Sequence, residues 1–288
     1  MALALPTLNL IGAGRVGQTL AQLWTRKGVL QVQDVLTRST ASARAALDVI
    51  APGAANACAV AHKADMRPAD IWLLAVPDAQ IAACAQELAT HARQCGGAPA
   101  LAFHCSGAQS AALLRPLRDL GWSVASAHPV LSFADAQTAV AQFAGTPCAM
   151  EGDSAACDTL CPLFTAIGGA CFAVRSQDKV LYHAAAVLAT NFAPVLQALA
   201  EEAWRATGVP DAAVLHLRER LLRHVVDNIV ALGPQQALTG PAARGDHLAI
   251  ARQADVVAQW DPQAAAAYRA LSTLALRIAG QAPEPPQA

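Results

Sequence analysis

The stretch Leu8-Asn9-Leu10-Ile11-Gly12-Ala13-Gly14-Arg15-Val16-Gly17 decides the fold of this chain. Its apolar first half is typical of a buried strand, its glycines follow the pattern Gly-x-Gly-x-x-Gly, and an amphipathic segment over 18–27 comes next. This order of strand, glycine turn and helix is typical of a dinucleotide-binding loop. Gly12 permits the tight turn, Gly14 lets a pyrophosphate approach the backbone, and Gly17 lets the helix pack on the strand. The predicted cofactor-binding residues of the loop are Gly12, Ala13, Gly14, Arg15, Val16 and Gly17.

Short apolar runs alternate with helix-like segments through the first part of the chain. The predicted strands are 8–11, 32–36, 71–76, 101–104, 124–128, 148–150 and 171–174. This alternation predicts an α/β Rossmann fold with a doubly wound parallel sheet, which the last two strands extend at one edge. From Gln177 on, strand-like runs stop and alanine- and leucine-rich segments predict an all-α C-terminal domain. We expect two domains: 1–175, which binds the dinucleotide, and 176–288, which completes the substrate site.

Glycine, proline and aspartate mark the ends of the predicted C-terminal helices. The first helix, over 178–207, ends before Gly208, and the second, over 210–232, ends at Gly233-Pro234. Asp246 can cap a third helix that reaches 260. Asp261-Pro262 is a cap followed by a first-turn proline for the last helix.

Composition narrows the class of protein. The chain has 20 basic and 21 acidic residues without a long run of either sign, which argues against a nucleic-acid partner. No apolar run reaches the roughly 18 residues of a membrane span, and the N-terminus lacks the basic region of a signal peptide. We therefore expect a cytoplasmic protein that does not bind membranes. The 8 cysteines form no Cys-x-x-Cys pair and the 8 histidines show no metal-ligand spacing, so no metal site is predicted.

The end of the second predicted strand bears on the choice of cofactor. Asp34 precedes the last apolar residues of that strand, so we expect it inside the strand or facing solvent rather than at a ribose 2'-hydroxyl. The strand leads instead into Thr37-Arg38-Ser39, two hydroxyls around a guanidinium. This group of donors suits a 2'-phosphate, so the sequence favours NADP over NAD. The alternative is that Arg38 is a solvated loop charge.

Three further predicted strands end in residues suited to chemistry. Ala75, Val76 and Pro77 end one of them and are predicted to contact the cofactor near the nicotinamide ribose. The next two end in 104–107, which contains Ser106, and in 126–129, which contains His128. Carboxyl ends of neighbouring parallel strands share one edge, so His104, Ser106 and His128 are catalytic candidates. Ser106 is also a candidate for cofactor binding, and His128 is also a candidate for substrate binding. A hydrogen-bonded structural role is the alternative for each.

The first C-terminal helix carries Lys179, His183 and Asn191 at offsets of four and eight residues, so one face offers a cation, an imidazole and an amide. These three residues are catalytic candidates. Pro194, inside the same helix, predicts a kink beside Asn191. The alternative is a simple packing adjustment.

The loop 238–246 is the most unusual in the helical half. Its glycines and proline fix a backbone path, and Arg244 offers a planar fork that suits a carboxylate. Thr239, Arg244 and Asp246 are therefore substrate-binding candidates, with a helix cap as the alternative for Asp246.

These segments together resemble a known family. The motifs are GAGRVG, TRS at 37–39, AVPD at 75–78, HCSG at 104–107, SAHPVLSF at 126–133, YHAAAVLATNF at 182–192 and LTGPAARGD at 238–246. They resemble Rossmann-like proteins followed by domain of unknown function 2520, usually described as NADP oxidoreductases. The order of parts is similar, more distantly, to prephenate dehydrogenases, pyrroline-carboxylate reductases and 6-phosphogluconate dehydrogenases. The resemblance implies a homodimer through the helical domain, and the family's naming also permits a deazaflavin cofactor.

Two functions follow as hypotheses. The first is an NADP-dependent oxidoreductase that moves a hydride to or from a small carbonyl, alcohol or imine bearing a carboxylate. His183 or His128 is then the acid/base, Asn191 and Ser106 hold the reacting atom, and Arg244 holds the carboxylate. The second is a dinucleotide-binding sensor or scaffold, which needs no proton donor beside the nicotinamide.

Overall fold

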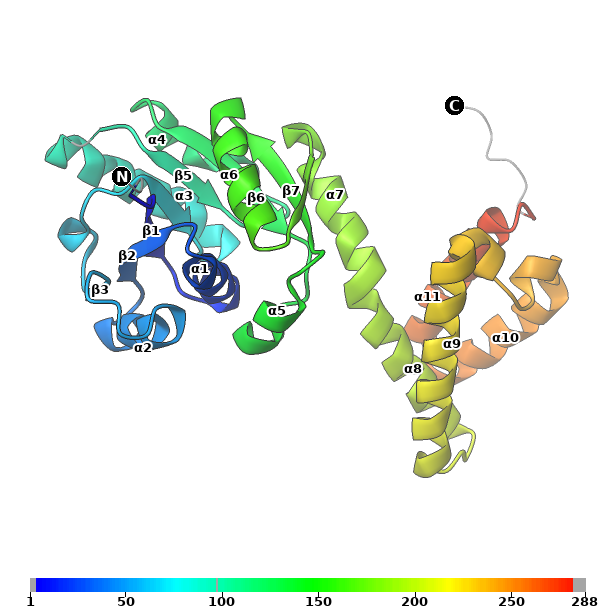
Figure 1. Cartoon of the computed structure of the whole chain (residues 1–288). Helices are drawn as coiled ribbons and strands as arrows, with labels where there is room; N and C mark the ends of the chain where they lie inside the picture. Colours follow the sequence, from blue (N-terminus) through cyan, green and yellow to red (C-terminus); the bar gives the residue numbers. More distant parts are fainter. Residues whose placement is uncertain (1–3, 97, 282–288) are drawn as a thin grey trace. The chain divides into compact units, whose positions relative to one another are not determined.

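The computed structural model describes residues 4–96 and 98–281 (Figure 1). These residues group into two compact units, within the ranges Met1–Ala189 and Thr190–Ala288. The first unit contains the sheet and its helices, and the second contains helices only. The α/β Rossmann fold followed by an all-α region is therefore confirmed.

The described residues form an eight-stranded sheet in the order β3-β2-β1-β4-β5-β6-β7-β8. All neighbouring strands run parallel except β6 and β7, which are antiparallel. The strand order reverses between β1 and β4, which is where doubly wound sheets bind ligands. The strands are β1 (Thr7–Ile11), β2 (Gln31–Leu36), β3 (Cys58–Val60), β4 (Ile71–Leu74), β5 (Leu101–His104), β6 (Ser123–Pro129), β7 (Pro147–Gly152) and β8 (Ala170–Ala173).

Helices cover both faces of this sheet, and successive residues of one strand serve the two faces. In β4, Ile71 and Leu73 join the core made with α1, α2 and α6, whereas Trp72 and Leu74 join the core made with α3 and the turn before α4. This alternation follows from the two-residue period of a strand. The helices are α1 (Arg15–Lys27), α2 (Thr40–Ile50), α3 (Asp78–Cys95), α4 (Arg115–Arg118), α5 (Ala136–Gln142), α6 (Ser154–Ala166) and α7 (Lys179–Ala186).

Trp24 of α1 is the centre of the first core. Its ring meets those of Phe103 and Phe164 edge to face, with centroids 6.3 and 5.3 Å away. Its indole N–H donates to the carbonyl of Leu163 at 2.9 Å, so the buried polar group is satisfied. These contacts hold α1 and α6 on the same face of the sheet and so fix the helix that begins at the glycine loop.

The helical unit follows the predicted boundaries closely. Asp246 accepts a hydrogen bond from the backbone N–H of Ala249, and Asp261 accepts from those of Gln263 and Ala264, so both predicted caps are confirmed. Gly233, at φ 78°, interrupts the long helix where the sequence predicted its end. The helices are α8 (Phe192–Ala206), α9 (Asp211–Ala237), α10 (His247–Trp260) and α11 (Pro262–Ile278).

A π-helical turn, Val187–Asn191, joins α7 to α8 just before Pro194. Such turns are frequent at functional sites, and this one agrees with the predicted irregularity beside Asn191.

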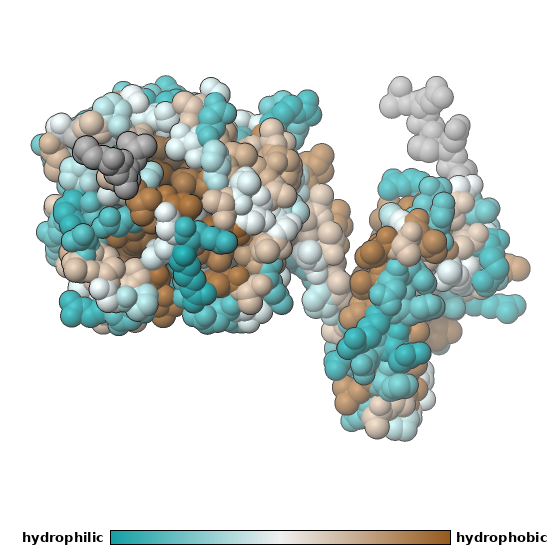
Figure 2. Space-filling model, in the orientation of Figure 1, coloured by the Kyte–Doolittle hydropathy of each residue, from teal (hydrophilic) through white to brown (hydrophobic). Residues whose placement is uncertain are grey.

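Within the described residues, the stretch Ser176–Ala206 is long and apolar enough to cross a membrane by length and composition. Helices of soluble proteins can meet the same criteria, and Figure 2 shows hydrophobic side chains at the surface of the helical unit.

Candidate active site at the carboxyl edge of the sheet

The glycine loop has the geometry that a bound pyrophosphate requires. Gly12 has φ 86°, and a Cβ added there would lie 2.4 Å from the carbonyl oxygen of Ala75. A Cβ on Gly17 would lie 2.9 Å from the Cβ of Ala75, so this glycine allows the close packing of α1 on β4. Gly14, by contrast, has no atom within 4 Å of an added Cβ. The loop is therefore tight at both ends and open at its centre.

The N-terminus of α1 is available to an anion. Its cap is Gly14, which offers no side-chain acceptor, and its first turn contains no acidic residue. The first backbone N–H groups of a helix have no partner inside the helix, and the helix dipole adds positive potential there. Gln18 donates to the carbonyl of Ala13 at 2.7 Å, and Arg15 donates to that of Phe133 at 3.3 Å, so two side chains from the first turn of α1 stabilise the loop and its surroundings.

Asp34 lies inside β2, which is the first of the two predicted placements, inside the strand or facing solvent. It is fully buried, its carboxylate accepts from the backbone N–H of Arg67 at 2.7 Å, and the guanidinium of Arg67 lies 2.6 Å from its other oxygen. Asp34 therefore braces the segment before β4 and is occupied by protein donors.

The Thr37-Arg38-Ser39 turn leaves one uncommitted donor group. Thr37 donates to the carbonyl of Ser39, and the Ser39 hydroxyl caps α2 by accepting from the backbone N–H of Ser42. Arg38 is exposed and forms no ion pair within the described residues. The guanidinium is the group of this turn that remains free to bind a 2'-phosphate.

The carboxyl ends of β4 and β5 are linked by hydrogen bonds. Ala75, Val76 and Pro77 follow β4, and Asp78 begins α3. The Ser106 hydroxyl donates to the Asp78 carboxylate at 2.6 Å and accepts from the backbone N–H of Gln109. Ser106 is only 6% exposed. Its hydroxyl thus holds the loop after β5 in place, and it reaches a substrate only if the bond to Asp78 is exchanged.

His104, the third candidate at these strand ends, has the hydrogen bonds of the structural alternative. It is fully buried, and its ring contacts two backbone groups, with Nδ1 accepting from the N–H of Ser106 and Nε2 lying 3.1 Å from the carbonyl of Ser110. Burial lowers its pKa to about 4, so the ring is neutral at physiological pH. This histidine shapes the loop 104–110.

Lys179 is buried at the start of α7, with 1% of its surface exposed. Its ammonium donates to the carbonyl of Ser106 at 3.0 Å and to the hydroxyl of Ser126 at 2.7 Å. These bonds attach α7 to the carboxyl ends of β5 and β6. Burial lowers the pKa of Lys179, which has no carboxylate within 4 Å among the described residues.

Two imidazoles and a phenol meet over Gly107. Nδ1 of His128 lies 2.9 Å from the hydroxyl of Tyr182, and the rings of His128 and His183 are 5.8 Å apart. A Cβ added to Gly107 would lie 2.5 Å from Nδ1 of His183 and 2.9 Å from Nε2 of His128. Only glycine at position 107 lets the strand end pass so close to both rings. The predicted residues Ser106, His128, Lys179 and His183 are therefore brought together.

The protonation states of this cluster differ. Burial and the positive charges of Lys179 and His183 lower the pKa of His128 to about 4. Burial raises the pKa of Tyr182 to about 12. Nδ1 of His183 is buried without a hydrogen-bond partner in the described residues, whereas Nε2 is not among these fully buried atoms. Nε2 is therefore the ring nitrogen of His183 that solvent or a substrate can reach.

The remaining candidates belong to the helical unit. Asn191 is exposed and its side-chain oxygen accepts from the hydroxyl of Thr190 at 2.7 Å. Thr239 and Arg244 are exposed in the loop before α10, and Arg244 forms no ion pair within the described part of the chain. Asp246 caps α10. Their roles toward a substrate stay predictions.

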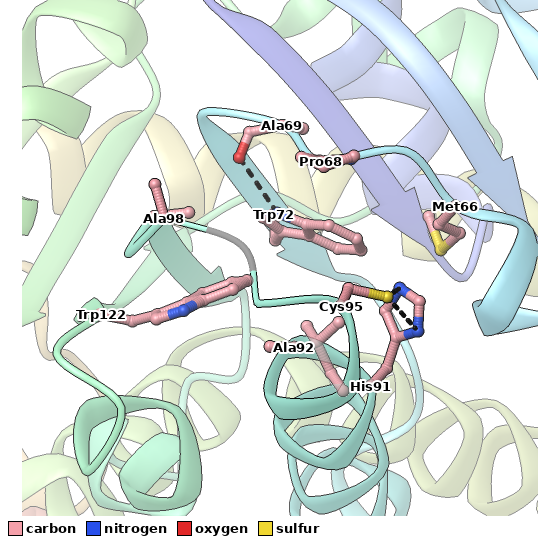
Figure 3. A pocket seen from close by; sticks show the side chains of 11 residues that line it. Met66, Pro68, Ala69, Trp72, His91, Ala92, Cys95, Ala98 and Trp122 are labelled. Carbon is pink, nitrogen blue, oxygen red and sulfur yellow. Dashed lines mark hydrogen bonds between the residues drawn. The ribbon is translucent and has the colours of Figure 1, made fainter.

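An apolar pocket lies at the opposite edge of the sheet (Figure 3). Its volume is about 50 Å³, and its walls come from the residues before β4, β5 and β6 and from the end of α3. Trp72 and Trp122 lie across it with ring centroids 5.8 Å apart, and the thiol of Cys95 lies 3.6 Å from Nδ1 of His91. The pocket is at the amino edge of the sheet, so it is separate from the dinucleotide loop.

Family models match most of the chain. A model of a Rossmann-like domain matches residues 4–129, and a model of domain of unknown function 2520 matches residues 146–275. The chain is a Rossmann-like protein with a DUF2520 domain. The resemblance drawn from the sequence motifs is thereby confirmed. No curated protein matched the chain.

Solved structures share this architecture along nearly the whole chain. Protein TM1727 from Thermotoga maritima is 25% identical, with a TM-score of 0.73 over 95% of this chain and 98% of that one. BF3122 from Bacteroides fragilis, named a "putative NADP oxidoreductase", is 23% identical, with a TM-score of 0.72 over 95% of this chain and 98% of that one. An imine reductase from Myxococcus stipitatus in complex with NADP+ is 18% identical, with a TM-score of 0.63 over 96% and 93%. At these identities, the last two show the shared fold.

Sequence reasoning missed several groups of this Rossmann-like, DUF2520 protein. Tyr182, which contacts His128, was read only as part of a family motif. Asp78 was read only as part of the AVPD strand end, although its carboxylate accepts from the hydroxyl of Ser106. Glu151 was not considered, although it accepts from the backbone N–H of Ala111 and the hydroxyl of Ser176. Glu151 pairs with Ser126 across the antiparallel β6–β7 ladder, a pairing for which the sequence carries no signal.

Proposed function

We propose that the protein is an NADP-dependent oxidoreductase that transfers a hydride to or from a small carboxylate-bearing carbonyl, alcohol or imine. One observation carries the proposal: the cluster of His128, Tyr182 and His183 lies at the edge of the sheet where the glycine loop opens an uncapped helix N-terminus. Groups able to move a proton therefore share an edge with a pyrophosphate site. Two of the structural neighbours support this choice, one named as an NADP oxidoreductase and the other an imine reductase in complex with NADP+.

The residues present fit a nicotinamide dinucleotide. The backbone of Gly12–Gly17 receives the pyrophosphate, Arg38 receives a 2'-phosphate, and Ala75–Pro77 line the nicotinamide ribose. The bound dinucleotide supplies the hydride chemistry. A deazaflavin in its place remains an alternative for the same loop.

His183 is the acid/base in this proposal. Its Nε2 is open to solvent, whereas the neutral His128 has a pKa of about 4 and is a poor source of protons at pH 7. Ser106 and Lys179 shape the strand ends through their hydrogen bonds. Asn191 and Arg244 are proposed to complete the substrate site from the helical domain, with Thr239 and Asp246 beside Arg244.

The helical domain, 176–288, is also proposed to form a homodimer in a cytoplasmic protein. Within this range, Leu188 is 66% exposed and Val230 is 81% exposed, among many other apolar side chains. Exposed apolar surface of this kind marks interaction sites. Light scattering coupled to size-exclusion chromatography tests the proposal, and a monomer at micromolar concentration contradicts it.

The cofactor assignment is tested by fluorescence titration of the purified protein with NADPH and NADH. We expect NADPH to bind at least tenfold tighter, and Arg38→Ala to remove most of this preference because one charged hydrogen bond is worth about 1.5–3 kcal/mol. Arg26→Ala, an exposed arginine in the last turn of α1, is the matched control and should bind like the parent. An equal loss of NADPH affinity in both variants would contradict the assignment. If the parent protein binds neither NADPH nor NADH, the enzyme proposal is refuted.

The acid/base assignment needs a separate experiment. His183→Ala should lower turnover by roughly 10²–10⁴-fold, the range typical of the loss of an acid/base residue. Its NADPH affinity should stay unchanged. Equal loss of both contradicts the role. If all small carbonyl and imine substrates fail while NADPH binds tightly, the protein is the dinucleotide-binding sensor or scaffold instead.

A further inference from the structure

Tyr182 has a partner that suggests a role of its own. Its hydroxyl lies 2.9 Å from Nδ1 of His128, and the two rings meet edge to face with centroids 5.7 Å apart. The ring of Phe172 in β8 also meets the phenol ring edge to face, with centroids 6.2 Å apart. The phenol ring therefore contacts residues of two strands, β6 and β8. Among the described residues, His128 is the only hydrogen-bond partner of this hydroxyl.

The direction of this hydrogen bond can be worked out. Burial keeps the phenol protonated and keeps His128 neutral, so two arrangements remain: the phenol donates to Nδ1, or Nδ1–H donates to the phenol oxygen. An imidazole nitrogen is a stronger base than a phenol oxygen, and the phenol proton has no other described acceptor. The phenol therefore donates to Nδ1. A neutral imidazole carries one ring proton, which leaves it on Nε2.

Nε2 of His128 faces the surface over Gly107. The Cβ position of Gly107 lies 2.9 Å from this nitrogen, and glycine leaves that position empty. Nε2 has no hydrogen-bond partner in the described residues, yet it is not among their buried unsatisfied atoms, so solvent or a ligand reaches it. The proton on Nε2 is therefore an available donor at the carboxyl edge of the sheet.

We propose that Tyr182 is a positioning residue that fixes His128 as a neutral Nε2–H donor, and that the site therefore takes a carbonyl or alcohol oxygen rather than a protonated imine. The inference rests on the proposed function. A donor N–H stabilises charge that develops on an oxygen. A protonated imine carries an N–H of its own and needs an acceptor, which this tautomer of His128 does not present.

The reaction balances with these groups. Addition of a hydride to the carbonyl carbon forms a C–H bond and moves the C=O π electron pair onto oxygen, so the substrate is reduced and NADPH is oxidised to NADP+. Nε2–H of His128 holds the negative oxygen without giving up its proton. Nε2–H of protonated His183, proposed above as the acid, then supplies the proton that forms the alcohol.

The tautomer is measured directly by long-range ¹H–¹⁵N correlation spectra of the full-length protein labelled with ¹⁵N-histidine. His128→Gln assigns the signals. We expect Nδ1 of His128 to show the shift of an unprotonated nitrogen and Nε2 that of a protonated one at pH 7. Tyr182→Phe should move both shifts toward a tautomer mixture. Tyr268→Phe removes the only other tyrosine hydroxyl, which binds Gln253 in the helical unit, and should change neither shift.

Each result decides. A proton on Nδ1 of His128 in the parent protein overturns the proposal, even if Tyr182→Phe fails to fold. Tyr182→Phe should keep parent NADPH affinity by fluorescence and lose roughly tenfold or more in kcat toward small 2-oxo acids. Turnover of cyclic imines in preference to the matched 2-oxo acids overturns the substrate class. If the parent protein does not bind NADPH, the proposed function is refuted. The tautomer spectra test the role of Tyr182 independently of that result.

Discussion

Alanine substitutions at Gly12 and Gly14 separate what the glycine loop does for folding from what it does for binding. Gly12 has φ 86°, and its added Cβ would lie 2.4 Å from a backbone oxygen of Ala75. A left-handed backbone costs a non-glycine residue about 1–2 kcal/mol. Overlap in a packed region costs about 1–3 kcal/mol more. We therefore expect Gly12→Ala to lose roughly 2–5 kcal/mol of unfolding free energy.

Gly14→Ala should behave in the opposite way. Gly14 has φ -72°, which any residue adopts, and no atom lies within 4 Å of its added Cβ. The unfolding free energy should change by no more than about 0.5 kcal/mol. The new methyl group enters the space that the pyrophosphate needs, so NADPH affinity should fall tenfold or more, which corresponds to about 1.4 kcal/mol.

The assays are thermal unfolding and NADPH fluorescence titration on the two variants and the parent. One kcal/mol lowers the melting temperature of a domain of this size by about 2–4 °C, so Gly12→Ala should melt roughly 4–20 °C lower. Gly14→Ala should melt within about 2 °C of the parent. Parent-like NADPH binding by Gly14→Ala would refute the reasoning about the pyrophosphate, and a parent-like melting temperature for Gly12→Ala would refute the steric argument.

Three further predictions concern buried charge, pH and thiols. Arg67→Met should lower the free energy of unfolding in urea by about 2–3 kcal/mol, because it leaves the carboxylate of fully buried Asp34 without its cation. The double variant with Asp34→Asn should recover part of that loss, and equal stability of the parent and the single variant would contradict the argument. His104 and His128 have pKa values of about 4 in the folded protein, below the value near 6.5 of an unfolded imidazole. The free energy of unfolding should therefore be at its full value above pH 6.5 and fall by up to about 1.4 kcal/mol per pH unit for each histidine down to pH 4. A urea midpoint that does not change over that range would contradict neutral buried rings. Ellman's reagent should modify the exposed thiols of Cys58 and Cys95 fast, and replacement of either cysteine by serine should remove one fast-reacting thiol. Buried Cys148, whose pKa is raised to about 12, should react slowly. Fast modification of Cys148 would contradict its position in the core.

Much of the fold could be predicted because its signals are local. A strand, a glycine turn and a helix follow one another within 8–27, and each glycine role needs only neighbouring residues. The caps at Asp246 and Asp261 are also local, since the side chain binds backbone two or three residues ahead. Strand β3 was missed because it has three residues and lies at the sheet edge with Cys58 exposed. Such a segment has no periodicity to detect.

The site was only partly predictable, because its contacts join distant segments. The spacing of Lys179 and His183 placed both on one helix face, and the structure brings both to the carboxyl edge of the sheet. No spacing rule could show that Tyr182, one residue before His183, meets a ring 54 positions earlier in the chain. The pairing of Glu151 with Ser126 likewise depends on a strand that runs against its neighbour.

Lys179, a catalytic candidate from the sequence, also has a structural role. The residue is 1% exposed, and its ammonium donates to a carbonyl and a hydroxyl, with no carboxylate in contact among the described residues. Burying a cation in this way is costly, and the cost is reflected in its lowered pKa. The same charge helps to lower the pKa of His128. The lysine thus attaches α7 to the strand ends and keeps the neighbouring imidazole neutral, which is the state that the proposed Nε2–H donor requires.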